Sequence, residues 1–120
     1  MAEHAQLGAN NVTKYLIVKG RVQNVMFRQT IMRAAIKRGL IAGATNIKTD
    51  KHRVDITLTG DPTKIQEIID GLSSNKNLNS WGAHAESVRI VESGKDPLSH
   101  EVNTSNVDNI KLKKGVEYYL

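Results

Sequence analysis

Hydrophobic and polar residues change their spacing several times along the chain, and each change marks a predicted element. The β-rich run at 15–18 predicts a buried strand that ends near Gly20. Apolar residues then recur at helical spacing from Phe27 onward and predict a helix over 27–38. Gly39 follows, which is the residue expected just past a helix end.

The middle of the chain repeats this change from strand to helix. A weaker strand is predicted over 41–47, and strict alternation over 53–59 predicts the half-buried strand of a hairpin. Asp61-Pro62 then supplies an N-cap residue and a proline at the first helical position. The second helix carries its apolar stripe at i, i+3, i+4 and i+7, on Ile65, Ile68, Ile69 and Leu72.

The two ends of the chain have weaker patterns. Residues 1–12 are polar and predict a flexible tail, which leaves 13–120 as one domain. Residues 75–83 read as a loop, and 87–92 predict another strand. The polar stretch 94–114 predicts no particular element, whereas 115–120 has the composition of an extra C-terminal edge strand.

The predicted order β-α-β-β-α-β indicates an α+β fold of the ferredoxin-like type. Two split βαβ halves form one antiparallel sheet, with both helices on one of its faces. Many proteins of unrelated function share this sandwich, so the fold class alone says little about activity.

Composition and charge restrict the kind of protein further. Lysine and arginine exceed aspartate and glutamate by 17 to 12, and the net charge of +5 suits an anionic ligand as well as an ordinary basic surface. With no cysteine in the chain, disulfides, thiolate metal sites and cysteine nucleophiles are excluded. No secretion signal or apolar span is visible, which predicts a cytoplasmic protein without a membrane partner.

The four histidines have no spacing that suits a metal ion. They lie in the predicted tail and loops, so we expect neither a metal site nor a catalytic role for them. They are His4, His52, His84 and His100.

The connection between the first strand and the first helix is the candidate for chemistry. Such a junction directs several backbone N–H groups and the positive end of a helix dipole at one point. Arg28 lies in the first turn of the predicted helix, where a cation is unfavourable unless an anion neutralises it. Its guanidinium suits two phosphate oxygens. From spacing alone, an ordinary connector with one exposed arginine remains the alternative.

This connection resembles the signature of the acylphosphatase family, G-x-V-Q-G-V-x-F-R. Further on, Gly39 to Asn46 resembles the family's segment G-L-x-G-W-V-x-N, although less closely. The resemblance covers residues 13 to 92 and implies the same fold as the hydrophobic pattern does. The residues that match the first motif are Gly20, Val22, Gln23, Val25, Phe27 and Arg28.

The resemblance implies a metal-independent hydrolase that splits the carboxyl-phosphate bond of acyl phosphates. Arg28 would bind the phosphate, and Asn46 would orient the attacking water. The expected partner is a small acyl phosphate or a similar anion, with no cofactor, no nucleic acid and a monomeric protein. The loop residues expected to form the substrate-binding cradle are Gly20, Arg21, Val22, Gln23, Asn24, Val25, Met26 and Phe27.

The chain departs from the family pattern at two places. Asn24 replaces a glycine in the middle of the cradle, and asparagine is among the best non-glycine residues for a positive φ. We therefore expect the loop shape to survive with altered, reduced turnover. Gly43 and Ala44 stand where the family has an aromatic and an aliphatic residue, which predicts a second strand that buries less apolar area.

Two other classes of function fit the same element order. RNA-binding modules of this topology stack bases on aromatic residues of the central strands. Here residues 54–58 contain no aromatic, and Tyr15 stands alone in the first strand. A regulatory small-molecule domain that has lost catalysis is the second alternative, and the changes at Asn24 and Gly43 are its support.

Overall fold

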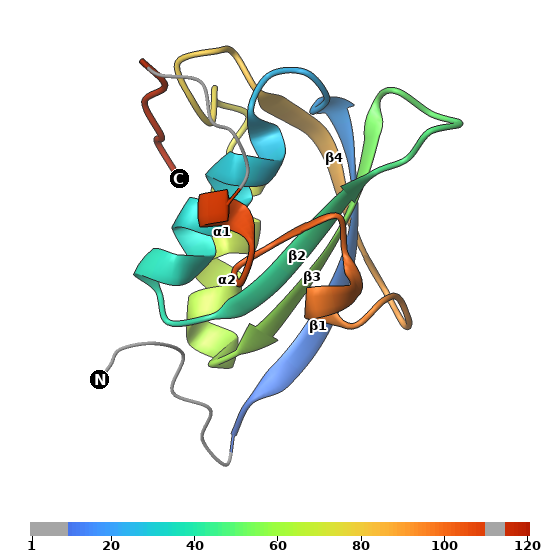
Figure 1. Ribbon diagram of the computed structural model, residues 1–120, viewed down its shortest axis with the longest axis vertical. Coiled ribbons are helices and arrows are strands. Elements are labelled where there is room, and N and C mark those ends of the chain that lie inside the picture. The colour runs from blue at the N-terminus through green and yellow to red at the C-terminus, as the bar shows by residue number, and fades with distance from the viewer. Residues whose placement is uncertain (1–9, 110–114) are drawn as a thin grey trace.

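The computed structural model describes residues 10–109 and 115–120 and has the predicted β-α-β-β-α-β order (Figure 1). The antiparallel sheet has the strand order β4-β1-β3-β2-β5, and the two helices lie on one of its faces. Residues 1–9 of the predicted tail lie outside the described residues, whereas Val12 already belongs to the first strand. The principal elements are β1 Val12–Arg21, α1 Phe27–Lys37, β2 Ile41–Asn46, β3 Arg53–Gly60, α2 Pro62–Leu72 and β4 His84–Val91.

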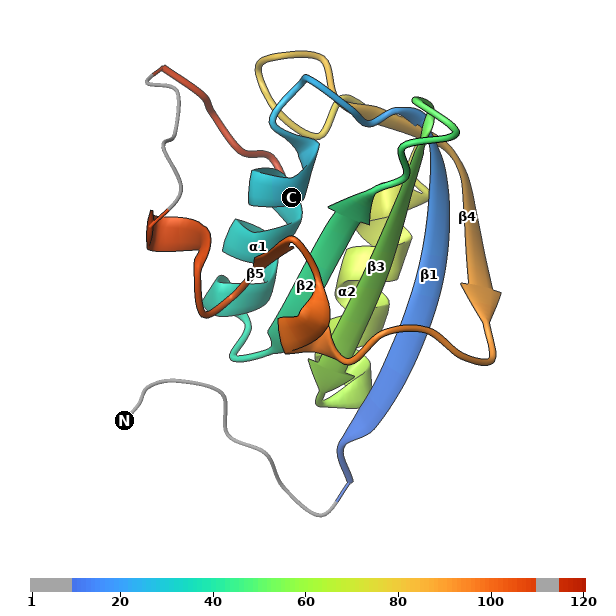
Figure 2. The same ribbon diagram turned by 45° about the vertical axis from the view of Figure 1, so that its right-hand side comes forward.

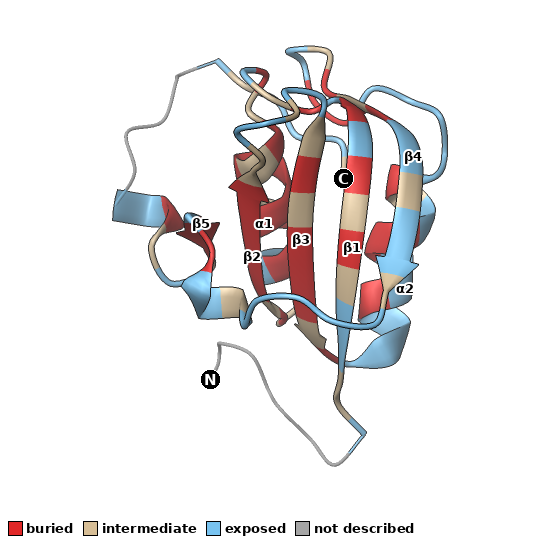
Figure 3. Ribbon diagram, turned by 90° about the vertical axis from the view of Figure 1, so that its right-hand side faces the viewer, coloured by how far each residue is buried: buried red, intermediate tan, exposed pale blue. Residues whose placement is uncertain are grey.

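The core lies between the sheet and the two helices, as the alternation in the sequence predicts. Val54, Ile56 and Leu58 of β3 are fully buried, and the bands of burial along the strands are visible in Figure 3. Helix α2 begins as predicted, because the Asp61 side chain accepts a hydrogen bond from the Thr63 N–H at 2.7 Å. The apolar stripe of α2 is buried through Ile65, Ile68, Ile69 and Leu72.

Two strand predictions require correction. The extra edge strand is β5, Val102–Asn103, which pairs with β2; residues 115–120 contribute only an isolated bridge between Tyr118 and Asn79. Because β5 occupies the edge of β2, the 115–120 segment does not extend the sheet there. Strand β4 begins at His84 rather than at 87, since an irregularity in β1 before Gly20 prolongs the pairing.

Residues 92–101, which we call the strap, cross the sheet face opposite the helices (Figure 2). The strap includes the short 3₁₀ helix η1, Pro97–Ser99, which packs on β2 and β3. A Cβ on Gly43 would collide with the Pro97 carbonyl and the His100 side chain. The strap fills the space above Gly43, so residues 42–45 are all buried although a glycine and two alanines contribute little apolar area of their own.

The His100 ring fixes the strap to the sheet through two threonines. Thr57 donates its only hydroxyl hydrogen to the Lys95 carbonyl at 2.7 Å, so His100 Nε2 donates to Thr57 Oγ1 at 2.8 Å. His100 Nδ1 lies 2.9 Å from Thr45 Oγ1, whose hydroxyl donates to it when the ring is neutral. Burial lowers the pKa of His100, the charge of Lys95 lowers it further, and Asp55 and Glu101 act in the opposite direction.

The lowered pKa of His100 predicts that the free energy of unfolding depends on pH. As the pH falls below 6.5, the ordinary pKa of histidine, the unfolded chain binds a proton at His100 before the folded chain does. We therefore expect the free energy of unfolding to decrease as the pH falls from 6.5 to the folded-state pKa of His100. Below that pKa, His100 should no longer make the free energy of unfolding depend on pH. Urea denaturation at several pH values measures it, and His100→Gln is the control that should remove the slope. An equal slope in both proteins would contradict the assignment.

Candidate active site

The loop between β1 and α1 comprises residues 22–26. Val22, Val25 and Phe27 are buried and anchor the loop in the core. Asn24 and Met26 have φ values of 64° and 59°, in the left-handed region. Left-handed residues in such a loop form concavities lined by N–H groups, which bind anions. The N–H groups of residues 22–26 donate no hydrogen bond to another residue that the structure describes.

A cavity of about 220 Å³ opens beside these N–H groups, and the start of α1 forms part of its wall. Met26 precedes the helix and supplies no side-chain cap, so the positive end of the helix dipole faces the cavity unneutralised by a cap. The residues that line the cavity are Val22, Asn24, Met26, Phe27, Arg28, Gln29 and Trp81.

Asn24 adopts the positive φ that the family's glycine would permit, as the sequence predicts. Asn24 lines the cavity, and it carries a side chain that glycine lacks. We therefore expect Asn24→Gly to raise kcat/KM for an acyl phosphate, by less than about tenfold because a single displaced contact changes the barrier by about 1 kcal/mol. Steady-state hydrolysis by the two proteins checks this, and no gain in rate would show that Asn24 does not hinder the substrate. Asn24→Ala is the control, since alanine is strained at this φ.

Asn79 is a positioning residue for which the sequence analysis predicted no role. Its Nδ2 donates to the Val25 carbonyl and to Thr30 Oγ1, both at 2.8 Å, while its Oδ1 accepts from the Trp81 N–H at 2.9 Å. Asn79 is almost fully buried and joins the two walls of the cavity. In the sequence it looks like any other turn-forming asparagine of a polar loop.

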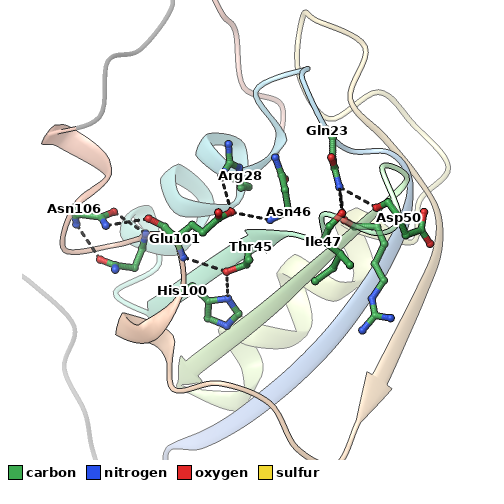
Figure 4. Close-up of polar contacts among 11 residues, drawn as sticks. Gln23, Arg28, Thr45, Asn46, Ile47, Asp50, His100, Glu101 and Asn106 are labelled. Atoms are coloured by element: carbon green, nitrogen blue, oxygen red, sulfur yellow. Dashed lines mark hydrogen bonds and ion pairs between the residues drawn. The ribbon is translucent and has the colours of Figure 1, made fainter.

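Arg28 and Asn46 meet at the same carboxylate (Figure 4). Arg28 Nη1 lies 3.2 Å from Glu101 Oε1, and the Asn46 backbone N–H donates to that oxygen at 3.2 Å. Asn46 is the last residue of β2, and its side-chain Oδ1 is buried without a hydrogen-bond partner among the described residues. An unpaired buried oxygen is costly, and such atoms in native structures commonly mark a place for a water or a ligand.

Other residues that the sequence predicts for the cradle contact neighbouring parts of the protein. Gln23 Nε2 donates to the carbonyls of Ile47, Asp50 and Arg53 at 3.2, 3.0 and 2.8 Å, so its side chain braces the turn between β2 and β3 (Figure 4). Gly20 has a φ of 143°, and a Cβ there would collide with the backbone of β4. The exposed Arg21 is beside Gly82.

Asp50, in the turn between β2 and β3, forms an ion pair with Lys19 of β1. Lys19 Nζ lies 3.2 Å from an Asp50 carboxylate oxygen. A hydrogen bond from the His52 backbone N–H and the contact with Lys19 both hold the pKa of Asp50 below its usual value. Within residues 10–109 and 115–120, no cluster of three or more acidic or histidine side chains could hold a metal ion, and no helix is long and apolar enough to cross a membrane.

Similarity to known proteins identifies the family of this chain. The sequence model of the acylphosphatase family matches residues 14–98. An acylphosphatase of Solibacter usitatus is 41% identical over 51 residues, which are 42% of this chain and 51% of that protein, so the match spans about half of its length. An acylphosphatase of Pyrobaculum islandicum is 29% identical over 80 residues, 67% of this chain and 79% of that protein.

Solved structures of acylphosphatases are also similar to this chain. The crystal structure of an acylphosphatase from Bacillus subtilis matches with a TM-score of 0.56 and 26% identity, over 70% of this chain and 88% of that one. An acylphosphatase from Coxiella burnetii has the same fold, with a TM-score of 0.60 and 21% identity over 76% of this chain and 90% of that one. The family model covers both Arg28 and Asn46, and the chain therefore belongs to the acylphosphatase family.

Proposed function

We propose that this protein hydrolyses the carboxyl-phosphate bond of acyl phosphates to a carboxylate and inorganic phosphate. The observation that carries the proposal is the set of N–H groups at residues 22–26, which have no hydrogen-bond partner among the described residues, beside the guanidinium of Arg28. The N–H groups are donors without an acceptor among the described residues, and the Arg28 guanidinium, which contacts Glu101 in this structure, adds a positive charge; a phosphoryl group requires both. The family resemblance implies that no metal ion or other cofactor takes part.

Arg28 and the loop N–H groups hold the phosphoryl oxygens and neutralise the charge that moves onto them as the bond breaks. Phosphoryl transfer depends mainly on positioning and electrostatic stabilisation, and preorganised donors supply both. Because the loop is anchored by Val22, Val25 and Phe27, its donors keep their directions without the substrate.

Asn46 orients the attacking water through its side-chain oxygen. Oδ1 is buried and unpaired among the described residues, so a water molecule that donates to it gains a fixed position. The water oxygen bonds to phosphorus, a phosphoryl oxygen takes the released proton, and the electron pair of the broken P–O bond leaves with the carboxylate. Since a carboxylate is a good leaving group, the site needs no strong acid to protonate it.

The alternative of an RNA-binding module has no support from the sheet surface. Such modules use the face opposite the helices, where aromatic side chains of the central strands stack on bases. In this protein the strap lies on that face, with Gly94 close to the Tyr15 ring and η1 on β2 and β3.

Hydrolysis of benzoyl phosphate, followed by ultraviolet absorbance, tests the proposed function. We expect an enzyme-dependent loss of substrate that is unchanged by EDTA, and a stoichiometric release of inorganic phosphate. A rate equal to the spontaneous hydrolysis would overturn the proposal. The cytoplasmic location and the monomeric state are further proposals from the sequence, and light scattering after size-exclusion chromatography measures the second.

A further inference from the structure

The carboxylate of Glu101 lies at the point where the proposed site needs an anion. One of its oxygens contacts the Arg28 guanidinium and the Asn46 N–H, each at 3.2 Å (Figure 4). An arginine in the first turn of a helix is stabilised by a negative partner, and in this structure that partner is Glu101. Glu101 lies beyond residues 14–98, which the family model matches.

The backbone of Glu101 is held in place on both sides. Its N–H donates to Thr45 Oγ1 at 3.1 Å, and its carbonyl accepts from Asn106 Nδ2 at 3.2 Å. The preceding residue, His100, is buried between Thr45 and Thr57. The strap therefore fixes where the Glu101 side chain starts, while 44% of that side chain is exposed and has room to rotate toward solvent.

We propose that Glu101 is an affinity-determining residue, whose carboxylate competes with the substrate phosphoryl group for Arg28 and for the Asn46 N–H. This inference rests on the proposed function of Arg28 as the phosphate ligand. Two anions cannot share these donors without repulsion, so the Glu101 side chain has to leave before a phosphoryl group binds there. Because the ion pair between Arg28 and Glu101 is partly exposed, breaking it costs little free energy. Glu101 therefore weakens binding of the phosphoryl group without blocking it.

The opposite role, a base that takes a proton from the attacking water, makes a different prediction. A base acts in the chemical step, so its loss lowers kcat. A competing anion acts on binding, so its loss lowers KM and leaves kcat nearly unchanged. The contacts favour the competitor, since the two groups that touch the Glu101 oxygen, the Arg28 guanidinium and the Asn46 N–H, are donors that a phosphoryl group would also use.

Glu101→Gln provides the test, because glutamine keeps the size of the side chain and removes its charge. Glu92→Gln changes an exposed residue directly after β4, removes one charge as well and is the matched control. Each protein is titrated with sodium sulfate at constant ionic strength, and the amide resonances of residues 22–28 are followed by NMR. Benzoyl phosphate kinetics on the same three proteins separate KM from kcat.

We expect Glu101→Gln to bind sulfate about three- to tenfold more tightly and to lower KM by a similar factor, with kcat changed less than twofold, which is about what a partly exposed ion pair is worth. Glu92→Gln should match the wild type. Unchanged sulfate affinity in Glu101→Gln overturns the inference, and so does a fall in kcat. Failure of the proposed function is recognised separately, because Arg28→Ala would then keep the sulfate affinity of the wild type.

Discussion

Replacing Arg28 with alanine lowers kcat/KM for benzoyl phosphate by about 10²- to 10⁴-fold, which is the range for a group that neutralises charge in a phosphoryl-transfer transition state. The loss reflects both weaker binding of the phosphoryl group and a higher barrier, because the guanidinium touches the group that reacts. Steady-state kinetics at saturating and limiting substrate measure the two contributions. Activity within a few-fold of the wild type would mean that the phosphate lies elsewhere.

Two further variants control for side effects of this change. Arg28→Lys keeps the charge but loses the planar pair of donors, so it should recover only part of the rate. Arg28→Ala leaves the Glu101 carboxylate without its partner, and the double variant Arg28→Ala/Glu101→Gln removes that carboxylate as well. If the double variant is as slow as Arg28→Ala, the lost rate belongs to Arg28 itself.

Replacing Asn46 with alanine lowers kcat by about 10²-fold or more, because a misplaced water loses the alignment that the amide gives it. KM should change little, since Asn46 positions water rather than the phosphoryl group through its side chain. Thermal stability should also change little, because Oδ1 has no hydrogen bond to lose among the described residues. Thermal unfolding and kinetics on one preparation check both results.

Asn77→Ala, in the exposed loop after α2, is the control for Asn46→Ala and should leave both quantities unchanged. A fall in kcat together with a large loss of stability would indicate that Asn46 maintains the fold instead. A normal kcat in Asn46→Ala would contradict its role in orienting water. Because each outcome compares a variant with the wild type, the three outcomes can be distinguished at any absolute rate of the wild-type enzyme.

The hydrophobic pattern was sufficient for the elements that bury one regular face. Both helices and strand β3 lie close to their predicted bounds, because a period of 3.6 or 2 in the sequence follows directly from helix and strand geometry. The left-handed φ of Asn24 was also predictable, since the preference belongs to the residue type. The strap and β5 have no regular alternation of apolar and polar residues, so the hydrophobic pattern did not predict them.

The sequence by itself determined the helices, the main strands, the loop from Gly20 to Arg28 and the family to which they belong. Only the tertiary structure decided what lies opposite Arg28: Glu101, 73 residues further along the chain. It also decided that His100 fills the space above Gly43 and that Asn79 holds the cavity walls together. The physical reason is that local periodicity and motifs arise from neighbouring residues, whereas these contacts depend on chain segments brought together only by folding.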